Sequence, residues 1–230
     1  MRATAISHVA ARPERRGRPQ ARPCVEARIA PTMTPDPAAL AASMLYAQVH
    51  LTLPPWIHQA VEPDLVCADD ESKMALAIRL SRINVERHTG GPFGAAIFSE
   101  TGRLVSVGVN RVVPLSCSVA HAEMMAFMTA QHRLQRFRLD LDDGHAFTLA
   151  TSSQPCCQCF GATVWSGVRR LLIGARAEDV EELTEFDEGP LPADWVGELA
   201  RRGIEVRRDI QREAAREVLA MYAAMGGAAY

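Results

Sequence analysis

The chain has 230 residues, 48% of them hydrophobic, and a formal net charge of −2. This size allows one large buried core, and six cysteines in so long a chain fit a reducing compartment better than a disulfide framework, so we expect a cytoplasmic protein. The longest uncharged stretch, residues 37–61, contains Pro54 and Pro55 and cannot form a membrane span.

The charge is unevenly distributed. The first 35 residues carry seven arginines and two glutamates, whereas the rest carries 18 basic and 25 acidic residues. An acidic body is a poor platform for phosphates, so nucleic acid is not the expected partner. Residues 1–36 are rich in Arg and Pro without apolar periodicity, which predicts a disordered extension or an upstream start codon. Many prolines and few serines argue against a transit peptide, and residues 37–230 form the predicted functional domain.

Apolar periodicity predicts strands alternating with helices along this domain. The expected helices cover residues 38–49, 71–88, 121–137, 156–165, 178–183, 195–202 and 211–225. The expected strands cover residues 95–99, 104–109, 147–151, 171–175 and 204–207, the first two forming a hairpin. This order favours an α/β fold whose sheet is covered on both faces.

Two short motifs carry the chemistry: His121-Ala122-Glu123 and Pro155-Cys156-Cys157-Gln158-Cys159. One imidazole and two thiolates suit zinc, and Cys156 and Cys159 face the same way in a first helical turn. Three protein ligands leave a fourth position open, as in catalytic zinc sites. Glu123 lies close enough to reach a water there. The pair of motifs resembles the signature of zinc-dependent base deaminases.

The alternatives are a chance arrangement and a closed structural zinc site. Chance leaves the clustering of the motifs unexplained. A structural site needs a fourth ligand, and the nearest thiol, Cys157, is adjacent to Cys156 and is expected to point elsewhere.

On these motifs the chain resembles the cytidine-deaminase superfamily, and within it the bacterial guanine deaminases that also act on the triazine ammeline. Further resemblance lies in residues 51–55, 91–95, 110–114, 159–169 and 186–190. The resemblance implies a three-layer α/β/α sandwich with a five-stranded mixed sheet. It also implies a Zn²⁺ cofactor and a homodimer, in some relatives with exchanged C-terminal segments.

The resemblance also implies site roles. His121, Cys156 and Cys159 would bind zinc, Glu123 would shuttle a proton, and Glu188 would donate a second proton. Asn110 would bind the base edge, with Phe93 and Trp165 flanking the ring. From the residues alone, Glu188 could equally belong to a solvated acidic turn, Asn110 to an ordinary turn, and the aromatic residues to the core.

The implied reaction is hydrolysis of guanine to xanthine and ammonia, with a purine or triazine base as the small-molecule partner. The rival hypotheses are deamination of a nucleoside, of cytosine or of adenosine in tRNA, and a non-enzymatic zinc-stabilised binding protein. Two features depart from the family pattern. Gln154 stands where the family often has Glu, so we expect altered zinc tuning or substrate preference. The chain stops at Tyr230, and the sequence leaves open whether its last residues close the pocket.

Overall fold

The computed structural model describes residues 49–141 and 145–230. The predicted extension 1–36 and all but the last residue of the predicted helix 38–49 lie outside the described residues.

A five-stranded sheet in the order β2-β1-β3-β4-β5 forms the centre of the body. The strands are β1 (Gly94–Phe98), β2 (Leu104–Val109), β3 (Thr148–Ser153), β4 (Arg170–Ala175) and β5 (Glu205–Arg207). β1 is antiparallel to both β2 and β3, whereas β3, β4 and β5 are mutually parallel. The predicted mixed sheet, including its β1–β2 hairpin, is therefore confirmed.

Six of the eight described helices agree with the predicted ones to within a few residues at each end. The eight are α2 (Ile57–Ala60), α3 (Asp70–Glu86), α4 (Val112–Leu115), α5 (Ala122–Leu134), α6 (Cys157–Ser166), α7 (Ala177–Leu183), α8 (Trp195–Ala200) and α9 (Arg212–Ala224). α5 ends before the expected residue 137 because Gln135 adopts a left-handed conformation, with φ of 53°. The sequence did not predict α2 and α4, which at four residues each are too short to show a periodicity.

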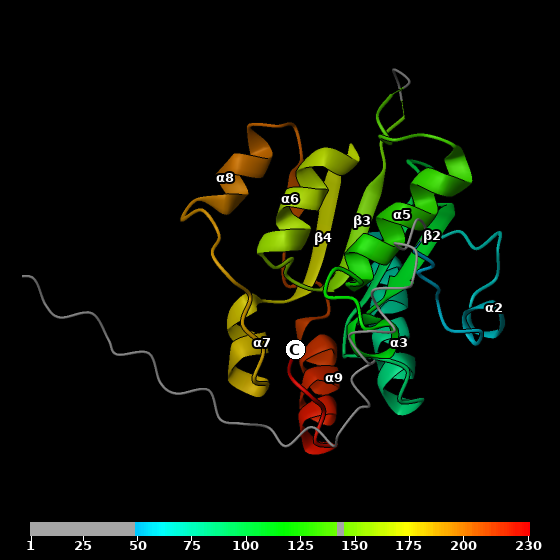
Figure 1. The fold of residues 1–230 in the computed structure, drawn as a ribbon. Coiled ribbons are helices and arrows are strands. Elements are labelled where there is room, and N and C mark those ends of the chain that lie inside the picture. Colours follow the sequence, from blue (N-terminus) through cyan, green and yellow to red (C-terminus); the bar gives the residue numbers. More distant parts are fainter. Residues whose placement is uncertain (1–48, 142–144) are drawn as a thin grey trace, which may run out of the picture. The chain divides into compact units, whose positions relative to one another are not determined.

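Helices cover both faces of the sheet (Figure 1). On one face α3 and α9 pack against it, and on the other α5, α6 and α8 do. β1 shows how the layers are separated: Ala96 and Phe98 belong to the first core, and Ala95 and Ile97 to the second. This alternation is the period-two pattern of a strand buried on both sides, and it gives the expected α/β/α sandwich.

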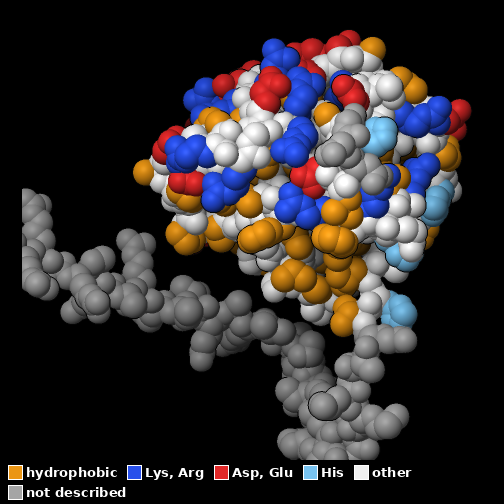
Figure 2. Space-filling view, turned by 90° about the horizontal axis from the view of Figure 1, so that it is seen from above, with side chains coloured by type: hydrophobic (Ala, Val, Ile, Leu, Met, Phe, Trp, Pro, Cys, Tyr) orange, Lys and Arg blue, Asp and Glu red, His pale blue; other side chains and the backbone are white. Residues whose placement is uncertain are grey.

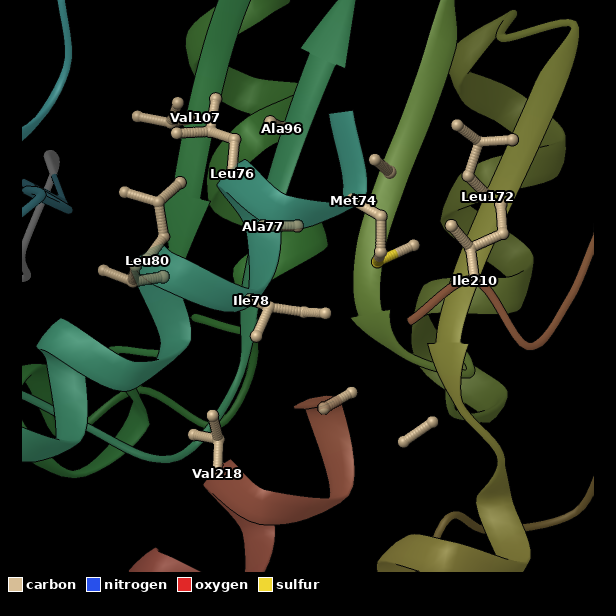
Figure 3. Close-up of a cluster of buried hydrophobic side chains, with 14 of the residues drawn as sticks. Met74, Leu76, Ala77, Ile78, Leu80, Ala96, Val107, Leu172, Ile210 and Val218 are labelled. Atoms are coloured by element: carbon tan, nitrogen blue, oxygen red, sulfur yellow. The ribbon is translucent and has the colours of Figure 1, made fainter. Parts of the chain in front are cut away.

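The first core lies between α3, α9 and the sheet (Figure 3). Met74 and Leu80 of α3 are fully buried there, and Val218 of α9 approaches from the other helix. α3 begins where Asp69 accepts a hydrogen bond from the Ser72 amide at 2.7 Å, a side-chain cap that satisfies one free amide of the first turn. The cap fixes the start of the helix that supports one side of the sheet.

Charged side chains of both signs are interspersed over the upper part of the face shown in Figure 2, and hydrophobic side chains gather along its lower border. This face therefore carries no extended basic platform. Within residues 49–141 and 145–230, no helix is both long and apolar enough to cross a membrane.

Candidate active site

The ends of two strands and the starts of two helices meet at one edge of the sheet. β2 and β3 run in the same direction, since each is antiparallel to β1, so their carboxyl ends share that edge. α5 begins beside it with His121 as its N-cap residue, and α6 begins beside it with Cys156 as its N-cap residue. Neither side chain caps its own helix, so both are free to bind a ligand.

His121, Cys156 and Cys159 form the metal-binding group found among the described residues, with ligand atoms within 4.8 Å of one another. His121 Nδ1 lies 3.5 Å from Cys156 Sγ and 3.6 Å from Cys159 Sγ. A tetrahedral zinc ion with bonds of about 2.0 Å to nitrogen and about 2.3 Å to sulfur would separate these atoms by about 3.6 Å. The donor set therefore fits zinc in both chemistry and spacing.

The thiol of Cys156 is electrostatically prepared for a cation. A hydrogen bond from Cys159, with a further one from His121, lowers the pKa of Cys156 to about 4. The amino-terminal end of α6 also favours negative charge at this position. Cys156 is thus a thiolate at neutral pH, the form in which cysteine binds metal.

Glu123 lies in the first turn of α5, beside the metal-binding group, and only 6% of it is exposed. Thr151 of β3 donates a hydrogen bond from Oγ1 to Glu123 Oε1 at 3.2 Å, and Cys159 Sγ lies 3.4 Å from Oε2. Burial raises the pKa of the Glu123 carboxyl. The carboxyl group is therefore fixed in place and can hold a proton more readily than an exposed glutamate.

A pocket of about 260 Å³ opens onto this group. Three aromatic residues, Phe93, Phe186 and Tyr230, form part of its wall. The Phe186 ring lies 5.2 Å from that of Phe93 and 4.8 Å from that of Tyr230, in tilted and edge-on geometry. Tyr230, the last residue, thus lines the pocket of its own chain, a question that the sequence alone did not answer.

Polar groups converge on the same pocket. The carboxamides of Asn110, Gln154 and Gln158 line it together with the carboxyl group of Glu188. Glu188 is 7% exposed, and its carbonyl oxygen accepts a hydrogen bond from the Cys157 amide at 2.9 Å. Burial, reinforced by the negative charges of Cys156 and Glu123, raises the pKa of Glu188 to about 8. Glu188 therefore holds a proton more readily than an exposed glutamate, and its burial shows that it is not part of a solvated acidic turn.

Asn110 immediately follows β2 and is 1% exposed. Its Oδ1 accepts a hydrogen bond from the Val112 amide at 3.2 Å, which leaves Nδ2 as the free end of the side chain. The sequence suggested either a turn residue or a ligand-binding residue. The geometry is compatible with both roles at once.

The structure brings seven of the eight predicted site residues together and leaves out Trp165. That side chain is 72% exposed and lines a separate surface hollow with Arg138 and Asp140. Six residues separate it from Cys159 on α6, a rotation of about 240° from that ligand's side of the helix. Within one chain, Trp165 therefore does not flank a base in this pocket.

The sequence analysis did not assign four residues that contribute to the site: Thr151, Gln158, Phe186 and Tyr230. Phe186 falls within one of the segments that carry the resemblance, which was the available signal. Gln158 lies within the cysteine motif, which placed it beside the metal-binding group but gave it no role. Thr151 and Tyr230 have no motif of their own, because only the folded chain brings them to the metal-binding group.

Comparisons with known proteins agree with this geometry. Residues 67–175 match the family described as the cytidine and deoxycytidylate deaminase zinc-binding region. A solved structure of guanine deaminase from Nitrosomonas europaea is 43% identical with a TM-score of 0.74, covering 79% of this chain and 100% of that chain. A structure of NE0047 with 2,6-diaminopurine is 45% identical with a TM-score of 0.74, covering 79% and 95%.

A curated relative is more distant. The probable cytosine deaminase of Schizosaccharomyces pombe is 36% identical over 94 residues, which cover 41% of this chain. The matched region spans 53% of that protein, about half its length.

Proposed function

This chain belongs to the cytidine and deoxycytidylate deaminase family of zinc-dependent aminohydrolases, and from that membership we propose that it hydrolyses guanine to xanthine and ammonia. The observation that carries the proposal is the pocket in which His121, Cys156 and Cys159 stand beside the buried Glu123. Its volume, about 260 Å³, lies just below the usual range of about 300–1,000 Å³ for ligand pockets. A free base suits this size better than a nucleoside or an RNA loop.

The residues would act on the 2-amino group of the base in a fixed order. His121, Cys156 and Cys159 would hold a zinc ion, which would supply Lewis-acid chemistry that makes water nucleophilic at neutral pH. Glu123 would accept the water proton and pass it to ring nitrogen N3. Its raised pKa and its hydrogen bond from Thr151 support this role, because a shuttle must both bind and release the proton.

Glu188 would deliver the second proton, which the amino group needs to leave as ammonia. A carboxyl with a pKa of about 8 carries that proton at neutral pH. Asn110 would hydrogen-bond the base edge, and Phe93 would pack against the ring. Phe186 and Tyr230 would continue this apolar wall.

The finer expectations extend the same proposal. Ammeline, a triazine that also carries exocyclic amino groups, is proposed as a second substrate. We propose a cytoplasmic location, because none of the five cysteines of the described region is in a disulfide. A role in purine catabolism follows from the proposed substrate. We also propose a homodimer, whose C-terminal segments could be exchanged between subunits; within the single chain, Tyr230 lies in its own pocket.

Ammonia release from a panel of substrates tests the substrate assignment. The panel should contain guanine, ammeline, cytosine, a nucleoside and a tRNA anticodon loop, since the relatives include proteins named for cytosine and for tRNA adenosine. We expect turnover of guanine and none of the tRNA. Activity on the anticodon loop without activity on guanine would overturn the assignment.

The change Glu123→Gln separates an enzyme from a zinc-stabilised binding protein. We expect retained zinc with turnover reduced about 10²-fold or more, because the proton shuttle is lost while the ligands remain. Glu185→Gln, the same change at an exposed position near Glu188, is the matched control and should leave turnover unchanged. A Glu123→Gln variant with wild-type turnover would contradict the enzymatic role.

A further inference from the structure

Gln158 carries an unsatisfied polar group at the site. It is the second residue of α6, between the two cysteine ligands, and it lines the pocket. Its Nε2 is buried and has no hydrogen-bond partner among the described residues. Buried amide groups are nearly always hydrogen-bonded, so an exception at a binding pocket needs an explanation.

Zinc binding does not explain a glutamine at this position. The two positions between the cysteines of a C-x-x-C pair supply no ligand, so the metal places no demand on their chemistry. Packing does not require the amide either, since an apolar side chain of similar length would occupy the same space without an unpaired donor. What remains is the pocket itself, which is where the side chain lies.

The neighbouring amides point to the same conclusion. Asn110 and Gln154 line the pocket with Gln158, and Oδ1 of Asn110 is already occupied by the Val112 amide. The amide hydrogens of Asn110 and Gln158 that have no partner within the described part of the chain therefore favour a ligand that offers hydrogen-bond acceptors. A purine base offers ring nitrogens and a carbonyl oxygen on its edge, in the plane in which amides donate best.

We propose that Gln158 is a specificity-determining residue whose amide donates a hydrogen bond to an acceptor on the edge of the bound base. The inference rests on the proposed function and adds to it one direct contact with the substrate. Bases that offer only a donor or a carbon atom at this position are rejected, because binding them leaves the buried amide unpaired.

The test is Gln158→Met, which removes the amide and keeps an unbranched side chain of similar length. Gln59→Met, the same change at an exposed residue of α2 outside the pocket, is the matched control. Both variants and the wild type are loaded with zinc, and KM and kcat for guanine, zinc content and the Tm without substrate are measured.

We expect KM to rise about tenfold in Gln158→Met with kcat within about threefold of wild type, since this hydrogen bond is present both before and during the reaction. Zinc content should be unchanged, and the Tm should equal or exceed that of the wild type, because an unpaired amide has been removed. Gln59→Met should match the wild type in every measurement.

Three outcomes would overturn the inference. A KM within about twofold of wild type would show that the amide does not contact the base. A lower Tm or lost zinc would show that the side chain is structural. Wild-type protein without guanine turnover would overturn the proposed function and this inference together, whereas the first two outcomes leave the proposed function standing.

Discussion

Asn84 is a fully buried side chain of α3 that joins Thr89, Gly91 and the pocket residue Asn110. Its Nδ2 donates to the carbonyl oxygens of Gly91 and Asn110, at 2.9 Å each. Its Oδ1 accepts a hydrogen bond from Thr89 Oγ1 at 2.7 Å. The backbone of Asn110 is held in this way, and its side chain, anchored through Oδ1 to the Val112 amide, can present Nδ2 to a base.

Asn84→Leu should therefore affect both stability and binding. The change leaves two buried carbonyl groups and one hydroxyl group without this partner, which should lower the free energy of unfolding by about 3 kcal/mol. KM for guanine should also rise, since Asn110 loses its support. Urea unfolding and steady-state kinetics measure the two effects.

The control for that change is Ser81→Ala on the same helix. Ser81 Oγ donates at 2.8 Å to the Ile78 carbonyl within α3 and makes no contact with the pocket. Its loss should cost about 1 kcal/mol and leave KM unchanged. Equal KM values for the two variants would show that Asn84 does not position Asn110.

At the scale of elements, the start of α5 is set by a close approach of β2. Gly108 of β2 lies against the first turn of α5, where a Cβ would overlap the Ala122 carbonyl oxygen and lie 2.6 Å from the Ala126 amide nitrogen. Both obstacles are backbone atoms, so the helix itself would have to move. His121 and Glu123 begin this helix, and their position therefore depends on the glycine.

Gly108→Ala should displace the start of α5 and weaken zinc binding by at least about tenfold, because a metal ligand moves with it. Gly161→Ala is the matched control. It lies within α6 with nothing within 4 Å of the added Cβ, and alanine there should stabilise the helix by about 0.5–1 kcal/mol. Competition with a zinc chelator and thermal unfolding measure the two effects. Equal zinc affinity in both variants would contradict the role of Gly108.

At the scale of the whole molecule, the sequence predicted those parts of the site that the chemistry of the metal restricts. Zinc accepts few residue types at few spacings, so His121, Cys156 and Cys159 stood out, and their grouping is confirmed in the structure. Short apolar runs predicted the strands for a similar reason, because strands buried on both faces of a sheet are apolar along nearly their whole length. The resemblance then supplied Asn110 and Glu188, which no periodicity singles out.

The remaining parts of the site depend on distant segments meeting. Tyr230 reaches the pocket only because the chain after α9 returns to Phe186, a path that no local pattern encodes. The error at Trp165 has the opposite origin. That residue is near the motif in sequence, but the rotation of α6 carries it to the outer surface. The position of Trp165 close to the motif correctly predicted that it lies on α6, but wrongly predicted which face of that helix carries it.

The helices α7 and α9, which precede the segments that close the pocket, are joined by an ionic cluster around the buried Asp179. Asp179 of α7 is 1% exposed and accepts hydrogen bonds from Arg212 of α9 at 2.6 and 2.7 Å, and from Arg216. The Arg176 amide donates to it at 2.8 Å. The hydrogen bond from Arg212 is the largest cause that lowers the pKa of Asp179 well below its usual range.

The stability of the protein should therefore depend on acid in a defined direction. The folded-state pKa of Asp179 lies below its unfolded value of about 3.9. The ionised carboxylate therefore contributes its full stabilisation above the unfolded pKa, and this stabilisation is lost as the pH falls through the folded-state pKa. Asp179→Asn should lower the free energy of unfolding by about 3 kcal/mol at pH 7, since one member of a buried charge cluster is neutralised. This difference from the wild type should begin to shrink below about pH 4, where the carboxylate of the unfolded wild-type chain takes up a proton that the folded protein does not bind.

Urea unfolding of both proteins between pH 7 and pH 3, at a constant zinc concentration, measures this difference. Glu198→Gln serves as the control, because Glu198 pairs with Arg201 and Arg202 at the surface, where water screens the interaction. That variant should follow the wild type at every pH. If the difference in the free energy of unfolding between Asp179→Asn and the wild type stayed constant from pH 7 to pH 3, packing between α7 and α9, and not the charge of Asp179, would hold the two helices together. In that case the wall of the pocket would not be weakened by acid through this residue.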